Sequence, residues 1–211
     1  ALSLYPELTH IHPDSAPASA HLALLHNREL GRFDQAYQWA TKGQSIDAGN
    51  MLYLSLEYGA LINAGEIELA RDSYRRMEDL DDKHYWVAVA GIEMSIRNGQ
   101  FAAAREQATF LNNSVNDRFA RWFSGYVYAV DEQYDRALSL ILSYEPAYAD
   151  RNQWARLLEQ EKQDACVAGW ILMKAQDEQL GRDLLAQSIK YLEETLPQYV
   201  AHADRYDSAI C

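Results

Sequence analysis

One pairing of residues recurs along the chain at a fixed interval. A glycine followed five residues later by an alanine returns every 34 residues, as Gly31 and Ala36, Gly65 and Ala70, and Gly99 and Ala104. Self-similarity at this length is typical of stacked supersecondary units and not of a single globular core. Residues 17–196 have room for about five such units.

An apolar stripe accompanies each copy. Its members step by three, four and three residues, which places them on one face of an α-helix. The second member is always small, so a neighbouring helix can approach closely there. The four sets are Phe33, Ala36, Ala40 and Gly43; Ile67, Ala70, Tyr74 and Met77; Phe101, Ala104, Ala108 and Leu111; and Tyr134, Ala137, Ile141 and Tyr144.

The later copies depart from the period. The fourth copy begins one residue earlier than the period requires, and Glu132 occupies the position of the glycine. We therefore expect its turn to use another residue. A fifth unit over 152–191 has Gly169 in its first helix and Gly181 at the small position of its second. The step from Ala137 to Gly181 is 44 residues, which predicts a long helix over 149–174 capped by Asp150.

The extra residues in that step predict a kink or short insertion near Tyr148. An inter-domain linker is the alternative, although no stretch rich in Gly and Ser or in charge supports it.

Over residues 17–144 these motifs resemble the tetratricopeptide-repeat (TPR) superfamily, with degenerate repeats. The resemblance implies an all-α fold, a right-handed α-solenoid of about five stacked antiparallel helix pairs. We expect an N-terminal segment at 1–16, the repeat domain at 17–196, and a C-terminal helix at 197–211 that caps the solenoid or opens a further repeat. Because Ala1 is not a natural initiator, we expect a fragment of a longer protein.

The resemblance also implies a binding surface, because the first helix of each TPR repeat lines the concave side. The residues that this pattern selects are Leu25, Arg28, Leu56, Ile62, Trp86, Val89, Glu93, Arg97, Phe119, Trp122 and Tyr126. Large aromatic residues on such a groove would anchor a peptide or an amphipathic helix. The competing interpretation is that they pack between helices.

Composition and motifs exclude several classes of function. With 19 basic and 31 acidic residues the net charge is −12, which argues against nucleic-acid binding and favours basic partners. No apolar run reaches 18 residues, so no membrane span is expected. His10, His12 and Asp14 form the only metal-like triplet, but no third His or Cys lies nearby in the sequence. The acidic run at 78–82 lacks the loop glycine and the ligand spacing of a calcium site.

The sequence offers no catalytic constellation and no phosphate-binding glycine loop, so we expect neither an enzyme nor a cofactor. Cys166 and Cys211 are too few for a disulfide framework; we expect Cys166 to be buried and the compartment to be reducing.

We therefore predict a non-catalytic module that binds a protein or peptide as part of a larger regulatory or signalling protein. The alternative is an effector-sensing domain for a small molecule or short peptide in a bacterial transcription regulator or nucleotide cyclase. The expected location is cytoplasmic, or periplasmic if the chain is attached to a membrane-anchored regulator. The expected oligomeric state is a monomer or weak homodimer.

Overall fold

The computed structural model describes residues 15–114, 118–175 and 177–200; within these ranges the side chains of 29, 118–119, 159–164 and 192–200 are not described. All elements in these ranges are helical, and no strand occurs among them. The chain divides into two compact units between Ala90 and Gly91, inside helix α6. No helix in the described ranges is long and apolar enough to cross a membrane.

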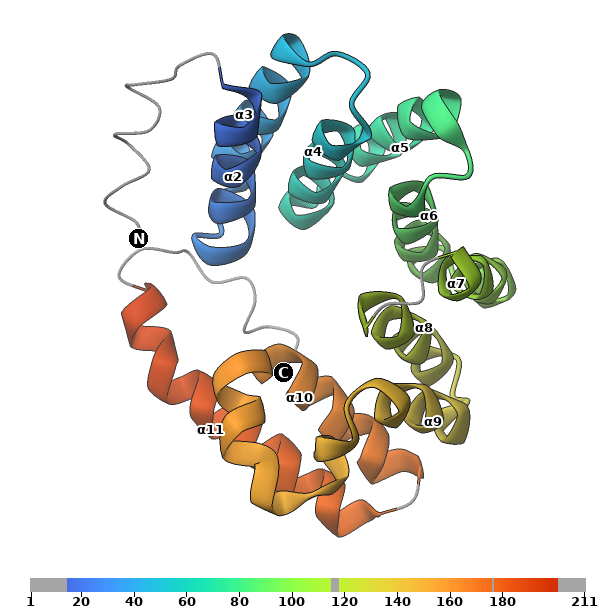
Figure 1. The fold of residues 1–211 in the computed structure, drawn as a ribbon, viewed down its shortest axis with the longest axis vertical. Coiled ribbons are helices and arrows are strands. Elements are labelled where there is room, and N and C mark those ends of the chain that lie inside the picture. The colour runs from blue at the N-terminus through green and yellow to red at the C-terminus, as the bar shows by residue number, and fades with distance from the viewer. Residues whose placement is uncertain (1–14, 115–117, 176, 201–211) are drawn as a thin grey trace. The chain divides into compact units, whose positions relative to one another are not determined.

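Unit 1 consists of two complete helix pairs and the start of a third. Its elements are α2 (Ala16–Leu24), the π-helix η1 (Leu25–Glu29), α3 (Phe33–Ile46), α4 (Met51–Ala64), α5 (Ile67–Asp81) and the first part of α6 (Tyr85–Arg97). From α2 to α5 each helix packs against the next, and the first helices α2 and α4 also touch (Figure 1). Ser15 and Asn50 cap α2 and α4 by accepting backbone N–H groups.

Unit 2 continues the alternation of first and second helices. After the end of α6 it contains α7 (Phe101–Ser114), α8 (Arg118–Val130), α9 (Tyr134–Tyr144), the 3₁₀ helices η2 (Pro146–Ala149) and η3 (Arg151–Gln153), α10 (Trp154–Ala175) and α11 (Glu178–Val200). The chain thus has an all-α fold of consecutive helix pairs, as the period predicts. Residues 197–200, predicted to open a separate helix, continue α11, and 201–211 lie outside the described residues.

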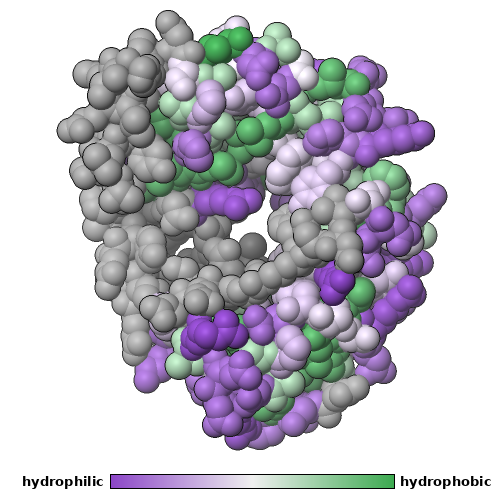
Figure 2. All heavy atoms as spheres, viewed as in Figure 1, coloured by the Kyte–Doolittle hydropathy of each residue, from purple (hydrophilic) through white to green (hydrophobic). Residues whose placement is uncertain are grey.

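The predicted stripes form the core of the second helices. Ala36, Ala70, Ala104 and Ala137, the small second members, are all fully buried. The solvent-facing side of the same helices is hydrophilic, with single hydrophobic residues among the polar ones, as Figure 2 shows over α5. This amphipathic pattern is what a helix covered on one face requires.

The turn after each first helix depends on a left-handed backbone. Gly31, Gly65 and Gly99 have φ angles of 59°, 81° and 69°. In the fourth copy Glu132 itself adopts this conformation, with φ 60°, so the expectation that another residue makes the turn is wrong. The geometry of the turn overrides the preference of the residue, because the following helix must begin in the same direction.

A hydrogen bond across each turn shows the same constraint. The amides of Glu66, Gln100 and Gln133 each donate to the carbonyl five residues earlier, at 2.8–2.9 Å. In the first repeat the corresponding bond runs from Arg32 N to His26 O, one residue further back. The π-helix η1 accommodates this extra residue, so the repeat keeps its turn despite a longer first helix.

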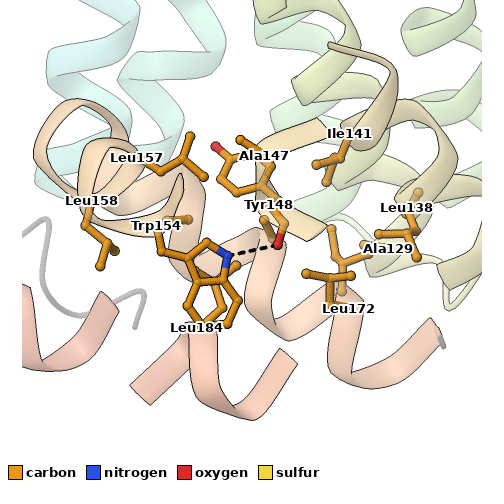
Figure 3. Close-up of a cluster of buried hydrophobic side chains, with 14 of the residues drawn as sticks. Ala129, Leu138, Ile141, Ala147, Tyr148, Trp154, Leu157, Leu158, Leu172 and Leu184 are labelled. Atoms are coloured by element: carbon orange, nitrogen blue, oxygen red, sulfur yellow. Dashed lines mark hydrogen bonds between the residues drawn. The ribbon is translucent and has the colours of Figure 1, made fainter. Parts of the chain in front are cut away.

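The insertion predicted near Tyr148 is present as η2 and η3. Tyr148 is fully buried there, and its carbonyl accepts a hydrogen bond of 3.2 Å from the Trp154 indole N–H (Figure 3). Asp150 caps η3 by accepting the amide of Asn152, and α10 begins only at Trp154, five residues later than predicted. Leu157, Leu172 and other buried side chains close this core.

The helices α10 and α11 cross at two glycines. A Cβ on Gly169 would lie 2.8 Å from the Leu185 nitrogen and 3.1 Å from the Gly181 oxygen, and one on Gly181 would meet the backbone of Met173 even more closely. Backbone atoms cannot yield as a flexible side chain does, so this crossing requires both glycines. The predicted positions of Gly169 and Gly181 are confirmed.

The left-handed turns give a matched pair of predictions. Gly65→Ala should lower the free energy of unfolding by about 1–2 kcal/mol, because a Cβ is disfavoured at this φ while the site is otherwise open. Glu132→Gly should raise it, by up to about 1 kcal/mol, since it relieves the same strain. Urea unfolding followed by circular dichroism measures both; equal signs for the two variants would contradict the account.

The glycine crossing gives a second prediction. Gly169→Ala should destabilise the protein by about 1–3 kcal/mol, because two backbones must separate. The control is Gly59→Ala in α4, where the nearest atom is the side-chain amide nitrogen of Asn27 at 3.3 Å; because alanine favours a helix interior over glycine, no loss of stability is expected there. A Gly169→Ala protein as stable as the Gly59→Ala control would show that the helices do not approach this closely.

Candidate functional site

All the predicted binding residues with a described position lie on first helices or their extensions. The structure places Leu25 and Arg28 in η1, Leu56 and Ile62 in α4, Trp86, Val89, Glu93 and Arg97 in α6, and Phe119, Trp122 and Tyr126 in α8. Each unit therefore holds a subset of the predicted groove, and the two subsets are considered separately.

Three of these residues cannot offer a side chain to a partner. Leu56, Ile62 and Val89 are 6%, 3% and 8% exposed and belong to the core of unit 1. The prediction is corrected at these positions, and the reason is visible in α4, whose buried residues are distributed around most of its circumference. A helix enclosed by neighbours on several sides has no free apolar face. The side chain of Phe119 lies outside the described residues.

Four predicted residues of unit 2 converge on one place. Trp122 and Tyr126, one turn apart on α8, stack with ring centroids 5.9 Å apart and planes 2° from parallel. Glu93 and Arg97, one turn apart on α6, both act electrostatically on the Tyr126 phenol. We call these four residues the α6–α8 site.

The Tyr126 phenol reports the environment of this site. Burial raises its pKa above the ordinary value for tyrosine, the negative charge of Glu93 raises the pKa further, and the guanidinium of Arg97 lowers it. Two opposite charges and a half-buried phenol therefore share one location. The site is amphipathic: a flat aromatic surface borders a carboxylate and a guanidinium.

One hydrogen-bonding group of the site is unsatisfied. The Trp122 indole nitrogen is buried and has no hydrogen-bond acceptor. A buried N–H without an acceptor costs roughly 1–3 kcal/mol. Arg97 is exposed, and no ion pair or hydrogen bond from its guanidinium is found within the described part of the chain. Both groups are donors, and Arg97 is the one that an oxygen atom of a ligand can reach in this conformation.

Unit 1 contains a polar network that the sequence reasoning missed. Glu57, only 5% exposed, accepts hydrogen bonds from the Ser73 hydroxyl at 2.5 Å, the Gln44 amide at 2.6 Å and Arg76 at 2.8 Å. Arg76 also donates to the Gln44 carbonyl oxygen at 2.7 Å. These bonds link α3, α4 and α5. The available signal was Glu57 itself, a charged residue inside an otherwise apolar helix.

The remaining candidate residues add no site among the residues that the structure describes. His10, His12 and Asp14 lie outside the described residues. Glu78, Asp79, Asp81 and Asp82 are exposed at the end of α5, and across the described ranges no group of three or more metal-ligating side chains comes together. Cys166 is buried in α10, as expected, but it is disulfide-bonded, which the expected reducing compartment did not predict.

Comparison with known proteins identifies the fold. No protein-family model and no curated protein sequence matches the chain. A solved structure described as "MamA RS-1 ArsTM double mutant" is 14% identical, with a TM-score of 0.51 over 85% of this chain and 96% of that one. A second, "MamA 41-end from Desulfovibrio magneticus RS-1", is 13% identical, with a TM-score of 0.50 over 90% and 97%.

At these identities the likeness concerns the fold alone. The helix pairs, the turns and the buried small residues define a helical-repeat protein. Its fold is TPR-like, similar to that of the TPR-like protein MamA.

Removing either charge near Tyr126 should shift the pKa of its phenol, in opposite directions for Glu93 and Arg97. Glu93→Gln should lower the pKa of Tyr126, because a nearby negative charge is removed, and Arg97→Gln should raise it. Nuclear magnetic resonance of ¹³Cζ-labelled tyrosine during a pH titration measures both. Since the folded pKa lies above the unfolded one, the contribution of Tyr126 to stability is present below the unfolded pKa and is lost as pH rises through the folded value. Shifts of equal sign would contradict the placement of these residues.

Proposed function

We propose that this protein is a non-catalytic helical-repeat module that binds another protein, and that the α6–α8 site contacts the main chain of that partner. The observation that carries the proposal is the Trp122 N–H without an acceptor, in a ring that stacks on Tyr126, whose phenol is also influenced by the exposed Arg97. A carbonyl oxygen of the partner would satisfy the indole and remove the cost of leaving it unbonded.

The residue types of the site support this role. Tryptophan, tyrosine and arginine are enriched among the residues that dominate binding energy at protein interfaces. The parallel stack of Trp122 and Tyr126 offers a flat, rigid surface that loses little side-chain entropy on binding. Stacked helix pairs in turn present such positions along an extended surface.

The charge of the chain is compatible with this geometry. A net charge of −12 favours partners with basic segments, which an acidic surface attracts over a distance. The main-chain carbonyl oxygens of a basic segment can accept hydrogen bonds from the Trp122 indole and the Arg97 guanidinium, as those of any segment can.

The test removes the indole N–H and keeps an aromatic ring. The wild-type chain would be immobilised to capture partners from the source cell, and the affinity of an identified partner would be measured by calorimetry. Trp122→Phe should weaken binding about tenfold, the effect of losing one buried hydrogen bond. The matched control is Trp39→Phe in the second helix α3, which should bind as the wild type does.

Two outcomes would contradict the proposal. One is a folded Trp122→Phe protein that binds its partner with unchanged affinity. The other is an equal loss of affinity in the Trp39→Phe control, which would indicate a general effect on the fold. Circular dichroism melting curves of both variants separate these cases from unfolding.

A further inference from the structure

A pocket in unit 1 lies apart from the predicted groove residues. It has a volume of about 280 Å³ and is formed where the ends of α3 and α5 meet the beginning of α4. Its lining residues are Gln44, Ala48, Gly49, Leu54, Arg76 and Leu80. None of the eleven residues predicted from the sequence belongs to it, so the proposal for the α6–α8 site leaves this pocket unexplained.

The apolar part of the pocket is unusually exposed at its rim. Leu54 is buried, but Leu80 is 45% exposed in a position that a polar residue would normally occupy. One period earlier, Ile46 is 38% exposed at the corresponding place on α3. When an apolar group fills a cavity, the aliphatic side chains at its rim are removed from water, which lowers the free energy of the system.

The polar part of the pocket includes Arg76, which the hydrogen bonds to Glu57 and Gln44 hold in place. Arg76 donates to the buried Glu57 carboxylate and to the Gln44 side chain, which fixes the plane of its guanidinium. A guanidinium has five N–H donors, so two such bonds leave further donors for a ligand. The Arg76 side chain is 51% exposed and can therefore be reached from outside.

The surroundings of the pocket are acidic. Glu78, Asp79, Asp81 and Asp82 are all exposed and flank Leu80 in the sequence at the end of α5. Like charge opposes the approach of a second copy of this chain, whose net charge is −12. Charge complementarity favours a basic partner.

We propose that this pocket is a second protein-binding site, which accepts one aliphatic side chain from a basic segment of a partner protein. The aliphatic group fills the space beside Leu54 and Leu80, and a main-chain carbonyl of the segment accepts from Arg76. Flanking lysine or arginine residues pair with the acidic residues after Leu80. The volume lies just below the roughly 300–1,000 Å³ of pockets for small organic ligands, which suits a single side chain.

The experiment uses the labelled peptide Arg-Lys-Leu-Lys-Arg and measures its fluorescence anisotropy with the full chain. Replacing the peptide's leucine by serine should weaken binding about tenfold, since the buried aliphatic group is lost. The acidic peptide Glu-Glu-Leu-Glu-Glu should not bind. Higher salt should weaken the binding of the basic peptide.

Protein variants locate the binding. Leu80→Ser should weaken the peptide about tenfold, whereas the control Leu69→Ser, an exposed leucine on the same helix outside the pocket, should have no effect. Both variants leave Trp122 and Tyr126 unchanged, so the difference between them reports this pocket and not the α6–α8 site. The proposal is overturned if the folded wild-type chain does not bind the basic peptide. It is equally overturned if Leu80→Ser and Leu69→Ser behave alike.

Discussion

The close contact between paired helices at one small residue is the constraint on which this fold depends. Ala36, Ala70, Ala104 and Ala137 have no exposed surface, and each lies five residues after a left-handed turn. The turn fixes where the second helix begins, and the alanine allows that helix to lie close to its neighbours. Gly169 and Gly181 allow an even closer contact, because there the backbones of α10 and α11 touch and no side chain fits between them.

The periodic parts of the structure could be predicted because period and stripe are local features of a sequence. The left-handed conformation of Glu132 could not be predicted, because the surrounding turn imposes its φ and glutamate has no preference for that region. The burial of Leu56 could not be predicted either, because it depends on how many neighbouring helices enclose α4. Trp122 and Tyr126 were predicted because the resemblance to TPR repeats places them on a first helix that lines the concave side. The partners of Glu57 lie 13 to 19 residues away from it and follow no period.

Two kinds of polar arrangement have different consequences for function. The Glu57 carboxylate receives three hydrogen bonds, so it stabilises the packing of α3, α4 and α5 and orients Arg76. The Trp122 indole N–H donates to no acceptor, so it remains an unsatisfied donor within an aromatic stack. A satisfied buried network specifies structure, whereas an unsatisfied group beside an accessible surface favours binding. The proposed binding role rests on this difference.

Photo-cross-linking at two positions of unit 2 tests the central claim most directly. Benzoylphenylalanine would replace Tyr126 on the first helix α8, or Phe110 on the second helix α7, where Phe110 is 39% exposed. Both positions are aromatic, so the substitutions are matched. The account predicts a discrete cross-linked partner protein from position 126 and none from position 110. Cross-links from position 110 alone, or from neither position in cells that contain the folded chain, would contradict a binding role for the α6–α8 site.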